Sequence, residues 1–302
     1  MTEEPRGGSG RVALLGWPVA HSISPAMQNA AFATAGLDWR YELLPVRRGA
    51  VGAAIERLAA EGFVGANVTV PHKRAVIDFA DDLAEDARTL GAVNTLVFNS
   101  DAEGVRICGY NTDHAGFLAP LLRRGFDLRG RRAVILGAGG AARAAAYALQ
   151  RAGTAEVTIL ARREGQAAAL SSELAHVGTG VLRMGRIGDR RALKAATNAS
   201  LLVNATSVGM APHDDQSPWP VDVSIPSDVL VYDLVYTPAE TRLLAHARAC
   251  GAEGLGGLEM LVAQGARAFT LWTGLEAPIE AMRSAAEKAL SGLIEVHNEE
   301  DR

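Results

Sequence analysis

Two ionisable side chains, Lys73 and Asp113, stand where predicted helices begin, and both are of types that exchange protons. Lys73 follows the strand predicted at 65–70, and we expect it in the first turn of the next helix. That end of a helix disfavours a positive charge, which eases a lysine toward the neutral form that can trade protons. Asp113 would be the N-cap or a first-turn residue of the helix predicted at 114–124. A solvated lysine and a capping aspartate are the plain alternatives, and position alone leaves both pairs of interpretations open.

Ser22 and Ser24 flank another predicted helix start. In His21-Ser22-Ile23-Ser24-Pro25, Ser24 is the expected N-cap and Pro25 the first helical residue, with the helix running to Gly36. Two hydroxyls beside the positive end of a helix dipole could bind a carboxylate. Equally, Ser24 could only cap and Ser22 only turn, and the spacing does not favour one interpretation.

The pattern Gly137-x-Gly139-x-x-Ala142 separates an apolar, β-branched run from a long alanine-rich segment. It predicts a buried strand, a tight turn and a helix. The first Gly permits the turn, the second lets a pyrophosphate approach the backbone, and the small third residue lets the helix lie close to the strand. Because the context fits, we favour a dinucleotide site over a mere turn.

The next predicted strand, 156–160, ends in Ala161-Arg162-Arg163. A site for NAD usually offers an acidic residue there for the ribose 2′-hydroxyl, whereas arginines suit a 2′-phosphate, so NADP is favoured. The alternative is an exposed charged turn. A further strand, 200–204, leads to Thr206 and Ser207, which would lie near the nicotinamide.

The elements that position these residues indicate two α/β domains. Strands are predicted at 11–16, 39–46 and 65–70, with an antiparallel pair at 89–98 and 105–110. Another strand at 229–234 leads to Tyr236 and a helix at 240–250. Two helices, 258–272 and 278–295, follow with no strand after them, so we expect the chain to return to the first domain. Gln264 shares an inward face with Leu261 and Ala268, and a substrate hydroxyl is one candidate partner for it.

Composition sets the broad class. The 302 residues suit two domains, and a net charge of −4 does not suggest nucleic acid or an anionic membrane as a partner. The charged, glycine-rich start lacks the apolar core of a signal peptide, and no apolar run could span a bilayer. Two cysteines, Cys108 and Cys250, have no metal-type spacing. We expect a reduced, cytoplasmic protein without a metal, with disordered tails at 1–10 and 296–302.

The chain resembles the shikimate dehydrogenase family from about Val12 to Glu295, with the motifs in the family's order. The motifs that carry the resemblance are His21-Ser22-Ile23-Ser24-Pro25, Asn67-Val68-Thr69-Val70-Pro71-His72-Lys73, Gly91-Ala92-Val93-Asn94-Thr95, Gly109-Tyr110-Asn111-Thr112-Asp113, Gly137-Ala138-Gly139-Gly140-Ala141-Ala142, Asn204-Ala205-Thr206-Ser207-Val208-Gly209-Met210 and Met260-Leu261-Val262-Ala263-Gln264.

The resemblance implies NADP-linked, reversible reduction of 3-dehydroshikimate to shikimate in chorismate and aromatic amino-acid biosynthesis, with Lys73 and Asp113 as the catalytic pair. It places a substrate-binding domain at 11–112 plus 257–295 and a Rossmann-like NADP-binding domain at 113–256, with the cleft between them. The implied substrate contacts are Ser22, Ser24, Thr69, Asn94, Tyr236 and Gln264. The implied cofactor contacts are Gly137, Ala138, Gly139, Gly140, Ala141, Ala142, Arg162, Arg163, Thr206, Ser207 and Gly257.

The chain departs from the family at one place. The family often shows Asn-Arg-Thr where this chain has Ala161-Arg162-Arg163, which leaves its strictness for NADP over NAD open. The rival functions are a quinate/shikimate dehydrogenase that uses NAD and a catalytically silent paralogue that senses ligand or redox state. Both serines and the absence of an acid after Leu160 favour shikimate with NADP, and the presence of Lys73 and Asp113 argues against a silent paralogue. A small-molecule substrate is the expected partner, and we expect a monomer or a homodimer.

Overall fold

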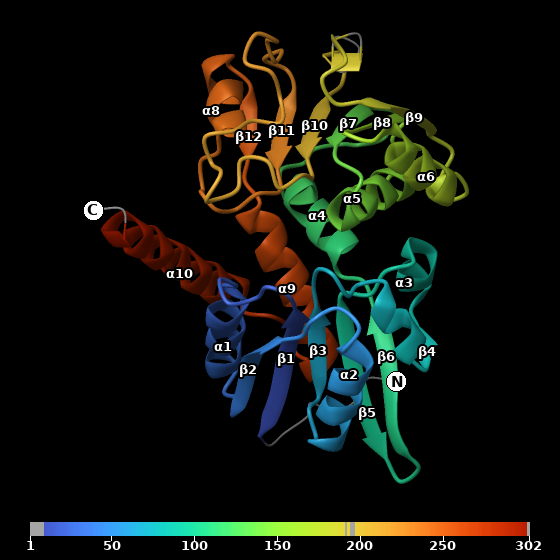
Figure 1. The fold of residues 1–302 in the computed structure, drawn as a ribbon, viewed down its shortest axis with the longest axis vertical. Helices are drawn as coiled ribbons and strands as arrows, with labels where there is room; N and C mark the ends of the chain where they lie inside the picture. Colours follow the sequence, from blue (N-terminus) through green and yellow to red (C-terminus); the bar gives the residue numbers. More distant parts are fainter. Residues whose placement is uncertain (1–8, 191, 194–196, 301–302) are drawn as a thin grey trace. The chain divides into compact units, whose positions relative to one another are not determined.

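The computed structural model describes residues 9–190, 192–193 and 197–300, and the side chains of 293–300 are not described. The chain divides into two compact units, each with its own sheet (Figure 1). Unit 1 comprises Met1–Thr112 and Val262–Arg302, and unit 2 comprises Asp113–Leu261. Residues 257–261, which the sequence groups with the first domain, therefore belong to unit 2.

The structure describes only part of the two predicted tails, 1–10 and 296–302. Residues 1–8 and 301–302 lie outside the described residues. Gly10, however, is the first residue of strand β1 (Gly10–Gly16), and helix α10 (Ile279–Glu300) includes 296–300. Gly10 pairs with Trp39 of the neighbouring strand, so it is not part of a disordered tail, whereas disorder at 296–302 stays a prediction.

Unit 1 contains a mixed six-stranded sheet in the order β2-β1-β3-β5-β6-β4. Its strands are β1, β2 (Trp39–Pro45), β3 (Gly65–Val68), β4 (Asp82–Leu83), β5 (Thr95–Asp101) and β6 (Gly104–Tyr110). β1 is parallel to β2 and β3, whereas β5 is antiparallel to both β3 and β6. The carboxyl ends of β1, β3 and β6 and the start of β5 therefore meet at one edge of the sheet.

Apolar side chains fill both faces of this sheet. On one face lie α2 (Val51–Ala60), the 3-10 helix η1 (Ala75–Phe79) and α3 (Glu85–Leu90), with Ile55, Val76 and Ala87 in the core. Helix α1 (Ser24–Thr34) packs with α10 and with α9 (Leu258–Thr273), where Phe32 stacks on Phe269 at 5.6 Å between ring centroids. The indole of Trp272 donates to Leu96 O (3.0 Å) and joins α9 to β5.

Unit 2 contains a six-stranded parallel sheet in the order β12-β11-β10-β7-β8-β9, the order of a Rossmann-like fold. Its strands are β7 (Arg132–Leu136), β8 (Glu156–Ala161), β9 (Val181–Arg186), β10 (Leu201–Asn204), β11 (Leu230–Asp233) and β12 (Glu253–Leu255). The central strands are buried along nearly their whole length, as expected of a parallel sheet covered on both faces. The predicted two-domain α/β fold is confirmed.

Helices cover both faces of this sheet. Helix α4 (Asp113–Arg123) packs on α5 (Gly140–Arg151), and α5 and α6 (Glu164–Leu174) pack on β7, β8 and β9. A core on the other face joins Leu136, Leu160 and Trp219 to helix α8 (Arg242–Ala249). Alanines give α5 its close packing, because Ala142, Ala145 and Ala148 are fully buried.

One predicted strand, 89–98, starts later than expected, because its first two residues belong to a helix. Residues 89–94, expected as the start of the antiparallel pair, begin as the end of α3, and the strand starts only at Thr95. Glu85 and Asp86 occupy the first turn of α3, where acidic residues favour the helix dipole, and Gly91 ends it with φ of 56°. The sequence interpretation also omitted β4, β9, β12 and α6. Short edge strands with exposed residues, such as β9, give little hydrophobic signal.

Candidate functional site

The two serines lie at the start of α1, but not in the predicted roles. Helix α1 begins with Ser24 itself, its N-cap position is Ile23, and no side chain caps it. Ser24 is thus a first-turn residue, and the Ser22 hydroxyl accepts a hydrogen bond from the Ser24 N–H (3.3 Å). The predicted N-cap role of Ser24 is therefore wrong, because the backbone at Ile23 is already helical. Both serines remain beside the positive end of the helix dipole.

Lys73 is not in a helix. It lies in a turn after β3, and the helix that follows, η1, is a five-residue 3-10 helix that begins at Ala75. The helix-dipole argument for Lys73 is therefore wrong, because a single 3-10 turn after it has only a small dipole. The turn is held in place from both sides. Lys73 O accepts from Val93 N (2.7 Å), and the buried His72 ring lies 2.7 Å from Val46 O.

Thr69 directly follows the last residue of β3, and its backbone makes two hydrogen bonds. Its N–H donates to Leu15 O (2.8 Å), and its carbonyl accepts from His72 N (2.9 Å). Trp17 N donates in turn to Val70 O (3.0 Å), so the chain after β1 is tied to the chain after β3. The half-buried Thr69 side chain is thereby fixed at the carboxyl edge of the sheet.

Asn94 belongs to a buried polar network at the same edge. Its Oδ1 accepts from Thr112 N (2.7 Å) and from the Thr95 hydroxyl (3.1 Å), and its Nδ2 donates to Thr112 Oγ1 (2.9 Å). The Asn67 Nδ2 donates to Asn94 O (3.1 Å) and to Thr95 Oγ1 (3.0 Å). The Thr112 hydroxyl also lies 3.4 Å from Gln264 Oε1 on α9. Two predicted substrate residues, Asn94 and Gln264, are thus connected through Thr112.

The network continues to a buried tyrosine that the sequence interpretation missed. The Tyr41 hydroxyl donates to Asn67 Oδ1 at 2.8 Å, and the Ser24 side chain lies beside the phenol. Burial raises the pKa of Tyr41 well above its usual range, and the Ser24 hydrogen bond only partly offsets it. Arg40 and Glu42 stand on either side of Tyr41 in β2, so the sequence pattern of the strand did not single out this hydroxyl.

Asp113 is the first residue of α4 and belongs to unit 2. Its side chain is buried, and a carboxylate in the first turn of a helix interacts favourably with the dipole. Of the two predicted positions, N-cap and first turn, Asp113 occupies the first turn.

The glycine turn of unit 2 has the geometry that its sequence predicts. Gly137 has φ of 112°, and a Cβ there would lie 2.8 Å from Ala205 O, so only glycine fits without strain. Its N–H donates to Leu160 O (2.7 Å), which ties β7 to β8. Helix α5 begins at Gly140, its N-cap Gly139 has no side chain, and Ala142 is buried. The first N–H groups of α5, those of Gly140, Ala141 and Ala142, have no acceptor within the helix.

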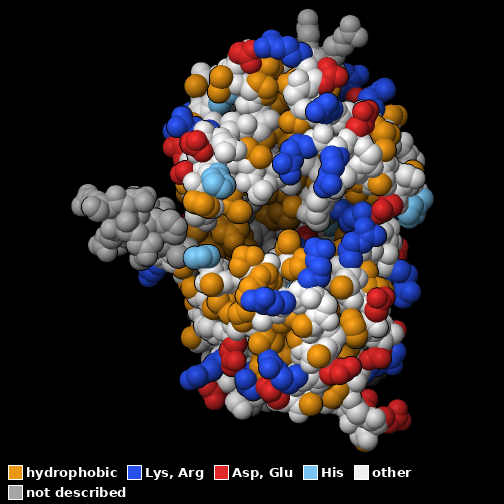
Figure 2. Space-filling model, in the orientation of Figure 1, with side chains coloured by type: hydrophobic (Ala, Val, Ile, Leu, Met, Phe, Trp, Pro, Cys, Tyr) orange, Lys and Arg blue, Asp and Glu red, His pale blue; other side chains and the backbone are white. Residues whose placement is uncertain are grey.

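Arg162 and Arg163 are exposed and lie between β8 and α6, with Arg163 in the N-cap position of α6. Lys and Arg side chains predominate in Figure 2 over the part of unit 2 that carries α5 and α6. The chain therefore has a positively charged turn at the end of the second strand of this sheet, which suits an anionic ligand.

A second buried network joins the loops after β10 and β11. The Asp233 carboxylate accepts from Thr241 Oγ1 (2.6 Å), Asn204 Nδ2 (2.8 Å) and Val235 N (3.0 Å). Asn204 Oδ1 in turn accepts from the Thr206 N–H (3.0 Å) and hydroxyl (2.7 Å). Desolvation raises the pKa of Asp233, although the three donors lower it in part. Polar residues that end two adjacent buried strands were the available signal for this network.

Three other predicted residues lie near this network. Ser207 is exposed and Tyr236 is half-buried, with a pKa raised by burial. Gly257 is tightly packed, because a Cβ there would lie 2.2 Å from Leu234 O. The Thr206 hydroxyl already donates to Asn204 and accepts from Val208 N (3.1 Å), so it primarily shapes its loop.

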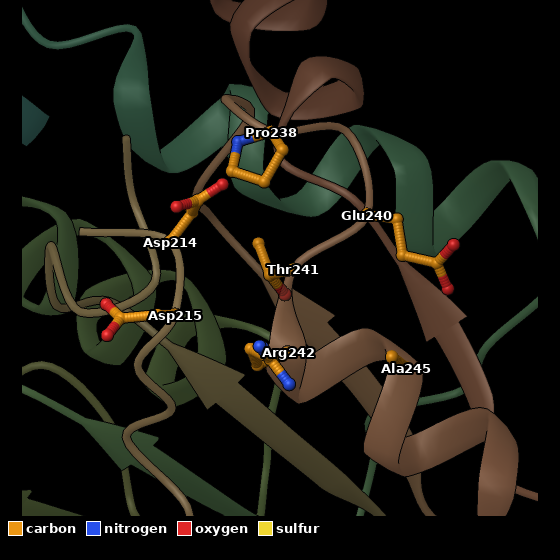
Figure 3. Close-up of a pocket in the computed structure, with 7 residues that line it drawn as sticks. All are labelled: Asp214, Asp215, Pro238, Glu240, Thr241, Arg242 and Ala245. Carbon is orange, nitrogen blue, oxygen red and sulfur yellow. The ribbon is translucent and has the colours of Figure 1, made fainter. Parts of the chain in front are cut away.

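A surface pocket beside this network contains none of the predicted residues (Figure 3). Asp214, Asp215 and Glu240 contribute carboxylates to its lining, but these point in different directions and do not converge on one point. Within the described residues, no group of three or more His, Cys, Asp or Glu side chains could hold a metal ion. Both cysteines are free thiols. No helix among the described residues is long and apolar enough to cross a membrane.

Comparison with known proteins gives one consistent result along the chain. Residues 14–96 match the shikimate dehydrogenase substrate binding domain, 121–234 match the family described as shikimate / quinate 5-dehydrogenase, and 257–287 match the shikimate 5′-dehydrogenase C-terminal domain.

Relatives extend the likeness to nearly the whole length. The shikimate dehydrogenase (NADP(+)) of Moorella thermoacetica is 47% identical over 285 residues, which cover 94% of this chain and 95% of the relative. The crystal structure of a Thermus thermophilus shikimate 5-dehydrogenase with NADP(H) and shikimate is 40% identical, with a TM-score of 0.82 over 93% and 99% of the two chains. A quinate dehydrogenase from Corynebacterium glutamicum, in complex with NAD, is 31% identical with a TM-score of 0.84 over 92% and 99%.

Proposed function

Because the chain belongs to the shikimate dehydrogenase family, we propose that it catalyses the reversible, NADP-dependent reduction of 3-dehydroshikimate to shikimate, a step toward chorismate and the aromatic amino acids. The observation that carries the proposal is the likeness to NADP-dependent shikimate dehydrogenases along nearly the whole chain. The glycine turn and the exposed arginines after β8 support the choice of dinucleotide.

Lys73 and Asp113 are the proposed catalytic pair. When bound, the reduced nicotinamide supplies the hydride that converts the ketone carbon to an alcohol carbon. Lys73 donates a proton to the carbonyl oxygen as that hydride arrives and takes it back in the oxidative direction. Asp113 orients the ammonium group and the substrate hydroxyl by accepting hydrogen bonds from both. The buried, first-turn position of Asp113 supports this role, because a fixed carboxylate positions its partners precisely.

The substrate contacts divide by chemistry. Ser22 and Ser24 hold the substrate carboxylate at the N-terminus of α1, where the dipole favours an anion. Thr69, Asn94, Gln264 and Tyr236 bind the carboxylate or the ring hydroxyls. The hydrogen bonds around Asn94 support a positioning of its amide before substrate arrives.

The dinucleotide contacts lie in unit 2. The backbone from Gly137 to Ala142 receives the pyrophosphate at the start of α5, Arg162 and Arg163 bind the 2′-phosphate, and Thr206, Ser207 and Gly257 lie toward the nicotinamide.

A quinate dehydrogenase that uses NAD is the second candidate, favoured by the likeness to the Corynebacterium glutamicum enzyme. The test crosses shikimate and quinate with NADP and NAD and follows absorbance at the nicotinamide band. We expect rapid reduction of the dinucleotide only in the reaction that contains shikimate and NADP. A preference for quinate with NAD would replace the proposed function by the second candidate, and silence in all four reactions would favour a ligand-sensing paralogue.

The role of Lys73 has a matched control on the same chain. Lys73→Ala should lower kcat on the order of a hundredfold or more, with a much smaller change in substrate binding. Lys288→Ala, which removes an exposed lysine from α10, should leave both unchanged. An unchanged kcat in Lys73→Ala would remove Lys73 from the chemistry.

The pocket assignments separate by ligand. Ser22→Ala should weaken shikimate binding without changing cofactor affinity, and a pure cofactor defect would contradict the assignment. Arg162→Ala should raise the KM for NADPH and leave that for NADH nearly unchanged, whereas equal effects would mean that Arg162 does not bind the phosphate.

The proposed setting is the cytoplasm, with two reduced cysteines, no nucleic-acid or membrane partner, and a monomer or a homodimer. Sedimentation velocity measures the assembly state, and cell fractionation tests the location. A higher oligomer or a membrane-associated fraction would contradict this part of the proposal.

A further inference from the structure

Strand β9 brings a third arginine to the corner of unit 2 where Arg162 and Arg163 leave the sheet. β8 and β9 are parallel neighbours, and Ala161 pairs with Arg186, the last residue of β9. Ile187 N donates to Ala161 O (3.1 Å), so the register holds to the end of both strands. Arg186 therefore stands beside the residue that immediately precedes Arg162.

The face on which Arg186 lies follows from its neighbour. A Cβ on Gly185 would lie 3.0 Å from the Leu160 side chain, which belongs to the core that faces α8. Successive residues of a strand alternate between faces, so Arg186 lies on the opposite face. That face is the one on which α6 packs, and α6 begins with Arg163 as its N-cap. Arg186 is exposed at the end of its strand, so its guanidinium is accessible to a ligand.

Neighbouring arginines form ion pairs with acidic side chains, whereas these three arginines do not among the described residues. Arg183 on the same strand pairs with Glu156 at 2.8 Å, Arg190 pairs with Asp222, and Arg143 on α5 pairs with Glu173. For Arg162, Arg163 and Arg186, no ion pair or side-chain hydrogen bond is found among the residues that the structure describes.

Three arginines at two neighbouring strand ends, with no ion pair among the described residues, make this corner positively charged, and a dianion would be attracted to it. The acids nearest in sequence are Glu164, in the first turn of α6, and Asp189, whose N–H donates to Arg186 O (3.1 Å), and two carboxylates do not balance three guanidinium groups. Ala161 has no polar side chain, so in the Ala161–Arg186 pair only Arg186 can offer a side-chain contact to a phosphate. Guanidinium groups match phosphate oxygens bidentately, which a point charge does not.

We propose that Arg186 is a specificity-determining residue that binds the 2′-phosphate of NADP together with Arg162. The ends of two adjacent strands, β8 and β9, would then both contact one phosphate. The proposal rests on the proposed NADP-dependent function and adds a contact from β9 to it. A charge-assisted hydrogen bond of this kind corresponds to a change of about 10- to 100-fold in affinity.

The binding test isolates the 2′-phosphate and does not need turnover. Calorimetry compares 2′,5′-ADP with 5′-AMP, which lacks only the 2′-phosphate, in wild type, Arg186→Ala, Arg186→Lys and Arg183→Ala. We expect Arg186→Ala to lose about 10- to 100-fold in affinity for 2′,5′-ADP and nothing for 5′-AMP. Arg186→Lys, which keeps the charge but not the bidentate geometry, should fall between the two. Arg183→Ala, on the same strand and already paired with Glu156, should match wild type.

A kinetic test with shikimate separates this proposal from the proposed function. Arg186→Ala should lower kcat/KM with NADP by a similar factor and leave the value with NAD unchanged. The double variant with Arg162→Ala should lose less than the product of the two single losses, because both groups bind one phosphate. Equal losses with NADP and NAD, or unchanged binding of 2′,5′-ADP, would overturn the role of Arg186. A wild-type protein that prefers NAD would instead overturn the proposed cofactor.

Discussion

Removing the hydroxyl of Tyr41 should destabilise unit 1 by an amount that the structure sets. The Tyr41 hydroxyl donates to Asn67 Oδ1 at 2.8 Å, and both side chains are buried. In Tyr41→Phe the Asn67 oxygen loses that donor in a place that water does not easily reach. Leaving a buried acceptor unsatisfied costs about 1–3 kcal/mol.

The same substitution in unit 2 should have the opposite outcome. The Tyr232 hydroxyl is buried, and among the described residues it has no hydrogen-bond partner. Its ring stacks on Phe117 at 5.2 Å between centroids, a contact that phenylalanine preserves. Tyr232→Phe should therefore be neutral or slightly stabilising, because it removes a desolvated hydroxyl and leaves no new group unsatisfied.

Urea unfolding monitored by tryptophan fluorescence measures both variants. With a slope of about 1–3 kcal/mol per molar urea, a loss of about 2 kcal/mol moves the midpoint down by about 1 M. Trp39 and Trp272 report on unit 1, and Trp219 reports on unit 2. Equal losses in Tyr41→Phe and Tyr232→Phe would refute the reasoning, since the hydrogen bond to Asn67 would then contribute nothing beyond the generic effect of the substitution.

Three further predictions concern unit 2. Thr241→Val removes both a donor to Asp233 and the N-cap of α8, and should cost about 2–4 kcal/mol in urea unfolding, whereas Thr241→Ser should retain most of that stability. The pKa of Asp233 is raised in the folded state, so its contribution to stability is fully present below the unfolded pKa and is lost as pH rises through the folded pKa. The unfolding free energy of wild type minus that of Asp233→Asn should therefore fall with rising pH in that window, and a flat or rising difference would contradict the shift. Gly137→Ala should lower the free energy of unfolding by about 1–3 kcal/mol, because its positive φ strains a residue with a Cβ. Gly139→Ala has open space around the added Cβ, so it should leave the free energy of unfolding unchanged but weaken dinucleotide binding measured by calorimetry. Equal losses of stability in the two variants would contradict this.

Local patterns predicted the parts of the fold that depend on local physics. The glycine turn was predictable because a β-branched run, a glycine and an alanine-rich segment each favour one structure at that point. The segment 89–94 was assigned wrongly because its apolar residues suit a strand, while the helix depends on the acidic first turn at 85–86 and on Gly91. Lys73 was assigned to a helix for a similar reason, since sequence alone does not separate a 3-10 turn from the start of an α-helix.

The polar networks were not predictable, because their members are far apart in sequence. Asn67 and Thr95 are separated by 28 residues, and Thr112 and Gln264 by 152. The inward direction of Gln264 followed from helical periodicity, but its neighbour depends on how α9 packs in unit 1. Tyr41 drew no attention because a tyrosine in a strand is ordinary unless its hydroxyl has a buried partner.

Topology explains why polar side chains gather at one edge in each unit. In unit 1 the antiparallel β5 starts where β3 and β6 end, so Asn67, Asn94 and Thr112 meet although they come from three different segments. In unit 2 the parallel neighbours β10 and β11 end in register at Asn204 and Asp233. Each pair of strand ends is tied by side-chain hydrogen bonds, so the loops that follow are held before any ligand arrives. Binding then orders fewer residues, and more of the interaction energy remains for affinity and for positioning the reacting groups.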